Sequence, residues 1–330
     1  MPSPLQFPDS IPLAQCPTPL QALRYRQKQS PNIRLWCKRD DLTGSVLSGN
    51  KVRKLEFILA DALRQGADTL ITCGGLQSNH CRATALVAAQ YGLRCRLILR
   101  GEQNSASSDG NLLLSELAGA EIEIYSPREY HANLPQLFLR AEQVVKARGS
   151  QPYSIPTGAS NDVGLWGYVA CARELALDFE RHNIHSPLVV CAAGSGGTLA
   201  GLSAGLNHFS PGAQVLGVAV CDSAEYFAKR VKADIQAAQA RFVDSGLSLP
   251  HPPMIVDDYI GPGYAIGYPE VFSVIRDLAR SDGLVLDPVY TGKAFYGMLE
   301  ELAQGRHQQR EIVFIHTGGV FGLFPYKNEL

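Results

Sequence analysis

LVVCAAGSGGTLAGL, residues 188–202, carries the clearest fold signal of the chain. Its apolar run Leu188–Ala192 reads as a strand, and Leu199, Leu202 and Leu206 recur at helical spacing after a loop of Gly, Ser and Thr. A strand that leads into a helix in this way is typical of α/β proteins. Glycines let the loop turn its N–H groups toward an anion, and the positive end of the next helix adds to that attraction. The stretch therefore predicts an α/β fold and a phosphate-binding loop made of Gly194, Ser195, Gly196, Gly197 and Thr198.

Two better-known phosphate motifs do not fit this loop. A dinucleotide fingerprint has three glycines, and Gly194 and Gly196 would be the first two. At the position of the third glycine this sequence has Leu199. No acidic residue ends a strand about twenty residues later, as that fingerprint requires. No Gly-Lys-Ser/Thr follows the glycines, which excludes a Walker A loop. A cup for a single phosphate remains, with a purely structural turn as the alternative.

On either side of this stretch, apolar runs alternate with helical patterns over most of the chain, which predicts parallel sheets covered by helices on both faces. We expect two three-layer domains, each built on a parallel sheet. The smaller domain, residues 52–161, is inserted in a larger one formed by residues 1–51 and 162–330. The crossings are SGNK (48–51) and the turn-rich QPYSIPTGASN (151–161), and the active site is expected in the cleft between the domains. The other predicted strands are 69–73, 94–99, 121–125, 215–220 and 311–316.

Composition narrows the classes of protein to consider. Hydrophobic residues make up 45% of the 330 residues and charged residues 18%, as in ordinary globular proteins. A formal net charge of −1 offers no basic face for nucleic acid. The start of the chain lacks the apolar run of a secretory signal, and no stretch reaches the roughly 20 apolar residues that span a bilayer. We expect a cytoplasmic protein with neither nucleic-acid nor membrane partners.

The eight cysteines are scattered along the chain, several of them inside apolar runs. They form no CxxC pair and no Cys/His cluster with zinc spacing. We therefore expect reduced, buried thiols and no structural metal.

A basic helix start lies in KRDDLTGSVLSGNKVRKLEF, residues 38–57. Lys51, Arg53 and Lys54 fall in the first turn of the predicted helix, where cations oppose the helix dipole. Such a turn indicates that an anion binds there and that neighbouring positive charges lower the pKa of Lys51. A lysine with a lowered pKa is a competent imine-forming nucleophile. A solvated basic helix face is the alternative.

Three further segments place polar side chains after strands or in loops. GGLQSNHCRA (74–83) offers Ser78 and Asn79 to a cleft, although either could simply cap the helix that follows. His80, in the same segment, is expected to be structural. LDPVYTGKAFYG (286–297) and FIHTGGVFGL (314–323) add hydroxyl groups and glycines near the end of the chain.

Together these motifs resemble a known family. KRDD…GNKVRKLEF, GGLQSNH, GSGGT, DDYIGPGY, LDPVYTGKA and HTGG are similar to those of 1-aminocyclopropane-1-carboxylate deaminases and D-cysteine desulfhydrases. These are pyridoxal 5′-phosphate enzymes with the tryptophan-synthase-β-like fold, fold type II. The resemblance runs from about residue 16 to residue 327, and it implies a small amino acid as substrate and a homodimer.

The resemblance also implies the roles of the cofactor-binding residues. Lys51 would form the Schiff base with the cofactor and later move the α-proton of the substrate. Lys54 and the backbone of Gly194–Thr198 would hold the phosphate, and Asn79 would bond the cofactor's 3′-oxygen. Either Thr317 or Thr291 would face the pyridine nitrogen.

On the substrate side, the resemblance places Ser78 near the substrate carboxylate, with Tyr264 and Tyr290 beside the reacting carbon. The cyclopropane deaminases have glutamate where this chain has Thr291, and glutamine where it has His80. Both differences favour D-cysteine desulfhydrase, a lyase that converts D-cysteine to pyruvate, sulfide and ammonium. A hydroxyl protonates the pyridine nitrogen less than a carboxylate does, which suits β-elimination of a good leaving group.

Other functions stay open from the sequence. The nearest is 1-aminocyclopropane-1-carboxylate deaminase, which opens the ring to 2-oxobutanoate and ammonium, and another D-amino-acid lyase or a racemase comes next. A non-catalytic amino-acid- or cofactor-binding protein could use the same scaffold, although a pure binder would not need the imine-forming Lys51. A nucleotide-dependent oxidoreductase is disfavoured by the failed fingerprint.

Overall fold

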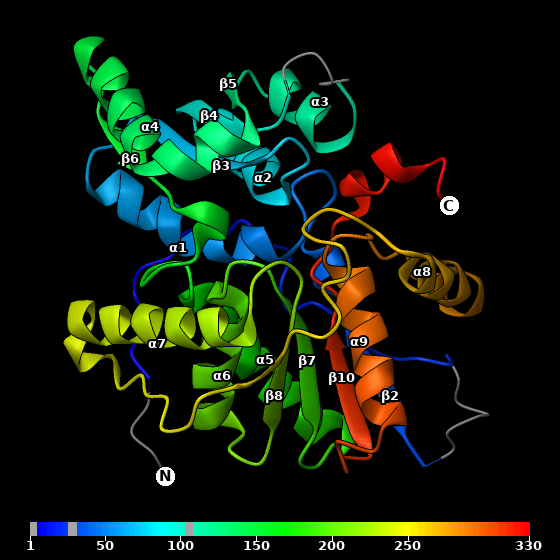
Figure 1. Ribbon diagram of the computed structural model, residues 1–330. Coiled ribbons are helices and arrows are strands. Elements are labelled where there is room, and N and C mark those ends of the chain that lie inside the picture. The colour runs from blue at the N-terminus through cyan, green and yellow to red at the C-terminus, as the bar shows by residue number, and fades with distance from the viewer. Residues whose placement is uncertain (1–4, 26–31, 103–107) are drawn as a thin grey trace.

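The fold contains two separate β-sheets (Figure 1). The structure is a computed structural model that describes residues 5–25, 32–102 and 108–330. All neighbouring strands are parallel except for the antiparallel pair β1 and β2. The larger sheet has the order β1 (Leu20–Ala22), β2 (Arg34–Lys38), β10 (Glu311–Ile315), β7 (Leu188–Ala193), β8 (Gln214–Ala219), β9 (Met254–Val256). The smaller sheet has the order β5 (Glu121–Tyr125), β4 (Arg94–Arg100), β3 (Thr69–Gly75), β6 (Pro152–Ser154).

Helices follow most strands, as expected for an α/β fold. They are α1 (Asn50–Arg64), α2 (Asn79–Gln90), α3 (Gly110–Leu117), α4 (Pro127–Ala147), α5 (Trp166–His182), α6 (Gly197–Phe209), α7 (Ala224–Arg241), α8 (Pro269–Asp282) and α9 (Thr291–Ala303).

The larger sheet separates two hydrophobic cores. Side chains alternate between the faces of a strand, so Val189 and Cys191 of β7 face one core and Leu188 and Val190 face the other. The first core contains residues of α5 and α6, and the second contains residues of α8 and α9. The sheet is therefore the middle of three layers.

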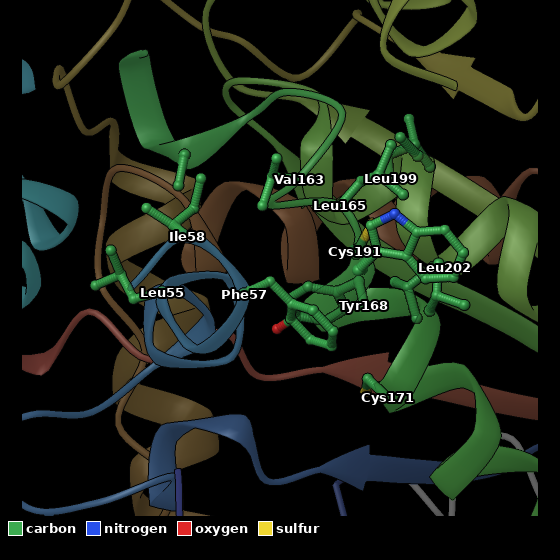
Figure 2. Close-up of a cluster of buried hydrophobic side chains, with 14 of the residues drawn as sticks. Leu55, Phe57, Ile58, Val163, Leu165, Tyr168, Cys171, Cys191, Leu199 and Leu202 are labelled. Carbon is green, nitrogen blue, oxygen red and sulfur yellow. The ribbon is translucent and has the colours of Figure 1, made fainter. Parts of the chain in front are cut away.

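The smaller sheet is also covered on both faces. Leu70 of β3 packs into the core that contains α1 and α2, whereas Ile71 and Cys73 pack against α4. Figure 1 shows α1 between the two sheets. In Figure 2, Leu55 and Phe57 of α1 lie in one buried cluster with Leu199 and Leu202 of α6. Because α1 packs on both sides, the position of its first turn is fixed relative to both sheets.

The six predicted strands are all present, with ends that differ by at most two residues. The strands of the smaller sheet all lie within residues 52–161, although the domain limits themselves stay a prediction. Four strands, β1, β2, β6 and β9, were not predicted from the sequence. Three of these have only three residues, too short for a pattern, and β6 lies in the segment that we interpreted as a crossing.

The cysteines are all free thiols, and six are buried. The expectation of buried thiols is wrong for Cys16, which is exposed, and for Cys221, which is half-buried. No group of metal-ligating side chains occurs in the described ranges. Among the helices that the structure describes, none is long and apolar enough to cross a membrane.

A buried ion cluster fixes the first turn of α1. The Arg53 guanidinium donates to both carboxylate oxygens of Asp40 at 2.9 and 2.8 Å, and to Glu174 of α5 at 2.7 Å. Thr18 and Tyr168 also donate to Asp40. Burial alone would raise the pKa of Asp40, but the charge of Arg53 and these hydrogen bonds hold it below its ordinary value. Arg53 is thus neutralised by protein carboxylates and does not await an external anion, contrary to the interpretation of its sequence position.

We predict that Asp40→Ala lowers the free energy of unfolding by about 3–5 kcal/mol, because it leaves the Arg53 charge buried with only part of its partners. Since the pKa of Asp40 is lowered in the fold, its contribution is present at neutral pH and is lost as pH falls through that pKa. Urea unfolding at pH 7 measures the loss. Glu225→Ala, which removes an exposed ion pair with Lys229, is the control and should cost less than about 1 kcal/mol. Equal effects of the two substitutions would contradict the role of the cluster.

Candidate active site

The amino end of α1 lies against the loop that follows β10. Gly49 has φ +90°, and a Cβ there would lie 2.8 Å from the Thr317 carbonyl oxygen. The Asn50 N–H donates to that same carbonyl at 3.1 Å, and the Asn50 side chain donates to Thr198 of α6. No acidic residue lies in the first turn of α1. The close approach of Gly49 thus brings the starts of α1 and α6 and the end of β10 to one place.

Lys51 and Lys54 share one hydrogen-bond acceptor. The Nζ atoms of both lysines donate to the Gly158 carbonyl at 3.2 Å, and Lys54 also donates to the Ser160 hydroxyl. Gly158 has φ +68°, and a Cβ there would lie 2.9 Å from the Lys51 Nζ and 2.4 Å from the Ser195 hydroxyl. Only glycine fits between these groups.

Burial lowers the pKa of Lys51 to about 8. The direction of this shift was predicted correctly from the sequence, but its predicted cause, neighbouring positive charge, was wrong. Burial also lowers the pKa of Lys54 well below its ordinary value, and the charge of Lys51 adds to that effect. No carboxylate lies within ion-pair distance of either amine in the described residues. An external anion beside these amines, or conversion of one of them to an imine, would therefore be stabilising.

A glycine loop joins β7 to α6 (Figure 1). This loop lies beside Lys54, and we call it the phosphate cup. Gly196 has φ +90°, and a Cβ on Gly197 would lie 2.9 Å from the Lys54 Nζ. A Cβ on Gly194 would lie 2.9 Å from the Tyr290 ring. The loop thus approaches its neighbours more closely than any larger residue would allow. Its N–H groups, the positive end of α6 and Lys54 suit a phosphate group.

Two groups that were not predicted from the sequence complete this cup. Ser160 donates to the Ser195 hydroxyl at 2.8 Å and accepts from the Gly197 N–H at 3.0 Å. Arg230 of α7 donates to the Ser160 carbonyl at 2.5 Å, and the side chain of Arg230 would meet a Cβ on Gly196 at 3.1 Å. Arg230 also pairs with Asp234. A second cation therefore stands next to the loop.

The segment between β3 and α2 reaches the same region. Ser78 is the N-cap of α2, because its hydroxyl accepts the Cys81 N–H at 3.2 Å. The Asn79 side chain accepts a hydrogen bond from Asn111. His80 bonds Thr72 through Nε2 at 2.8 Å, and burial lowers the pKa of His80 well below its ordinary value. His80 is therefore neutral at physiological pH, in line with a structural role.

Tyr264 and Tyr290 face each other with their hydroxyl oxygens 2.5 Å apart. Burial raises the pKa of both phenols. The loop that carries Tyr264 is held by Lys293, whose amine donates to the Ile260 and Gly263 carbonyls at 2.8 and 2.7 Å. The two tyrosines thus form a neutral hydrogen-bonded pair at ordinary pH.

The two threonines proposed for the pyridine nitrogen lie in different surroundings. Thr291 is fully buried, and its hydroxyl donates to Asp287 at 2.7 Å. Asp287 also accepts the N–H groups of residues 289–291, and burial raises its pKa despite these bonds. The other threonine, Thr317, lies on the wall of the cavity that contains Lys51, whereas Thr291 does not.

That cavity has a volume of about 720 Å³, within the usual range of a small-molecule site. Lys54, Gly197 and Thr291 are the predicted site residues that do not line it, and the Lys54 amine lies beside Gly197 at the start of α6. It contains both Lys51 and the cup, as a phosphate-bearing aldehyde cofactor requires. The predicted site residues on its wall are Lys51, Ser78, Asn79, Gly194, Ser195, Gly196, Thr198, Tyr264, Tyr290 and Thr317.

Comparison with known proteins extends this assignment. The family model of "pyridoxal-phosphate dependent enzyme" matches residues 11–318. A candidate 1-aminocyclopropane-1-carboxylate deaminase of Thermotoga maritima is 43% identical over 323 residues, which cover 97% of this chain and 99% of that protein. The mitochondrial bifunctional D-cysteine desulfhydrase/1-aminocyclopropane-1-carboxylate deaminase of Arabidopsis thaliana is 40% identical over 328 residues, which cover 96% of this chain and 80% of that protein.

A solved structure, described as an ACC deaminase homologue, has the same fold with a TM-score of 0.88 and 36% identity. The match covers 98% of this chain and 95% of that one. The comparisons thus bear out the resemblance, fold type II and the cofactor, pyridoxal 5′-phosphate. This chain belongs to the pyridoxal-phosphate dependent enzymes.

Proposed function

We propose that this enzyme is a D-cysteine desulfhydrase, which eliminates sulfide from D-cysteine and releases pyruvate and ammonium. The observation that carries the proposal is the half-buried Lys51, with a pKa of about 8, in a cavity that also contains a phosphate cup and a tyrosine pair. A protein that binds only an amino acid would have no use for an imine-forming lysine at this place. Both relatives are named as 1-aminocyclopropane-1-carboxylate deaminases, and one is also named as a D-cysteine desulfhydrase, which supports a lyase or deaminase of a small amino acid.

The residues around the cavity divide between the cofactor and the substrate. Lys51 would hold the cofactor covalently, and Lys54 with the loop Gly194–Thr198 would hold its phosphate. Asn79 would bond the 3′-oxygen. When bound, pyridoxal phosphate supplies an electron sink for the carbanion that forms at the substrate's Cα.

The protein's own part in the reaction is binding and proton transfer. Lys51, once displaced by the substrate, would take the proton from Cα as a neutral amine, which its lowered pKa favours. Ser78 at the amino end of α2 would bind the substrate carboxylate, because the positive helix end attracts anions. Tyr264 and Tyr290 would lie beside Cβ, where the phenol protons can be donated to the leaving sulfur.

The surroundings of the threonines favour Thr317 at the pyridine nitrogen. The Thr291 hydroxyl is engaged by Asp287 and is not part of the cavity wall, whereas Thr317 is on that wall. A hydroxyl partner protonates the ring less than a carboxylate does, and β-elimination of thiolate tolerates a weaker electron sink than ring opening. The support for D-cysteine is then the hydroxyl of Thr317 itself, since the difference from the cyclopropane deaminases at Thr291 lies off the cavity wall.

Ring opening of 1-aminocyclopropane-1-carboxylate is the second candidate function, favoured by the names of both relatives. The Arabidopsis protein is named for both reactions. The homodimer and the cytoplasmic location stay predictions.

We predict a kcat/KM for D-cysteine at least about tenfold above that for 1-aminocyclopropane-1-carboxylate, because the hydroxyl partner limits the electron sink. The assay measures sulfide and keto acid for both substrates, with L-cysteine and D-serine tested in parallel. Lys51→Ala is the control and should abolish turnover. Faster ring opening than sulfide release by the unmodified enzyme would overturn the substrate assignment and leave the cofactor in place.

We predict that Thr317→Val changes the absorption spectrum of the bound cofactor and lowers turnover of D-cysteine, because it removes the hydroxyl at the cavity wall. Thr291→Val should leave that spectrum unchanged and lower the free energy of unfolding by about 1–3 kcal/mol, since Asp287 loses a buried donor. Absorbance spectra and urea unfolding of both variants separate the two roles. A spectral change in Thr291→Val alone would show that Thr291 is the ring partner.

A further inference from the structure

The cavity extends beyond the residues that the proposed reaction uses. Its outer part lies between the carboxyl end of β4 and α4, and we call it the outer chamber. Polar, aromatic and apolar side chains line it, and a small substrate such as D-cysteine has no need of them. They are Arg100, Tyr130, His131, Leu134, Pro135 and Phe138.

Arg100 is the charged group of the outer chamber. Its guanidinium carbon lies 4.7 Å from the centre of the Tyr264 ring and 5.7 Å from that of Tyr130. Its Nη1 donates to the His131 Nε2 at 2.8 Å. Arg100 ends β4 beside Gly75 of β3, at the strand edge that leads toward Ser78. Two aromatic rings and one hydrogen bond therefore hold the planar guanidinium in one orientation.

This arginine forms no ion pair with a carboxylate in the parts of the chain that the structure describes. Arg96, four residues earlier on the same strand, pairs with both Glu121 and Glu123. A guanidinium has five N–H donors in a fork that matches the two oxygens of a carboxylate, phosphate or sulfonate. An arginine fixed in a cavity and lacking a carboxylate partner is suited to bind such an anion from a ligand.

The position of Arg100 indicates which part of a substrate it would meet. The Tyr264 ring lies under its guanidinium, and the Tyr264 hydroxyl contacts Tyr290, next to the proposed site of the reacting carbon. The substrate's own carboxylate already has a proposed site at Ser78. We propose that Arg100 binds an anionic group on the β-substituent of the amino-acid substrate, so that the enzyme accepts β-thio-substituted D-amino acids that end in a carboxylate, sulfonate or phosphate. This inference rests on the proposed function.

S-carboxymethyl-D-cysteine illustrates the reaction that this subsite would permit. The Cα proton passes to Lys51, and the Cβ–S bond breaks with its electron pair on sulfur. The sulfur takes up a proton and leaves as thioglycolate. One water molecule converts the remaining three-carbon unit to pyruvate and ammonium, so no oxidant or reductant is needed.

The test compares this compound with S-carbamoylmethyl-D-cysteine, which has nearly the same shape but a neutral amide in place of the carboxylate. The holoenzyme is titrated with each compound, and binding is read from the cofactor absorbance while turnover is read from pyruvate. We expect the wild type to prefer the carboxylate, and Arg100→Gln to reduce that preference about tenfold or more. Because each enzyme is tested with both compounds, differences in leaving-group chemistry cancel.

Two further variants complete the design. Arg100→Lys keeps the charge without the fork and should retain part of the preference. Arg94→Gln, at the exposed opposite end of β4 and outside the cavity, should retain all of it. Should Arg100→Gln fail to fold, Arg100→Lys still tests the inference. Its preference for the carboxylate compound must be weaker than that of the wild type but still present.

Three results would overturn the subsite. In the first, Arg100→Gln weakens both compounds equally, which would place the α-carboxylate on Arg100. In the second, Arg100→Gln binds both compounds as the wild type does and keeps the full preference for the carboxylate. In the third, the wild type binds neither compound. Failure of the proposed function can be distinguished from failure of the subsite. In that case D-cysteine is not turned over, but the binding preference for the carboxylate compound still depends on Arg100.

Discussion

The ion cluster of Arg53, Asp40 and Glu174 holds the catalytic region in place. Arg53 lies between Lys51 and Lys54 in the first turn of α1, and its bonds join that turn to the 3-10 turn after β2 and to α5. Removing a charge from water is costly, so a buried arginine is stable only where its partners are correctly placed. The same bonds that neutralise Arg53 fix the backbone from which both lysines project. Their geometry is therefore set by a group that the proposed reaction does not use.

The cluster also explains why the two lysines remain available. Asp40 and Glu174 bind Arg53. The amines of Lys51 and Lys54 instead donate to the Gly158 carbonyl and the Ser160 hydroxyl. Neutral acceptors compensate a buried ammonium poorly, and burial therefore lowers both pKa values. An imine on Lys51 and a phosphate beside Lys54 would relieve this cost. These two amines, which have no carboxylate partner among the described residues, are thus a source of affinity for the cofactor.

The local motifs could be predicted from the sequence, whereas their long-range partners could not. The glycine loop 194–198 is recognisable by strand, glycines and helix within fifteen residues, and its position was predicted correctly. From the sequence, Arg53 and Lys54 are two equivalent cations in one helix turn. Only the fold shows that Arg53 binds Glu174 of α5, which is 121 positions away. Gly158 stood in a segment that we interpreted only as a crossing, and nothing local shows that its carbonyl meets both lysines. Arg100, likewise, ends an ordinary strand, and only the fold reveals that it faces Tyr264.

Lys51 as the residue that carries the cofactor is the centre of the proposed chemistry, and peptide mapping of the reduced holoenzyme tests it directly. Borohydride reduction makes the imine permanent, and mass spectrometry of the peptides then locates the cofactor. We expect an adduct on the peptide that contains Lys51 and its absence from Lys51→Ala. An adduct confined to Lys54 or Lys293, the other buried lysines of this region, would show that a different amine holds the cofactor.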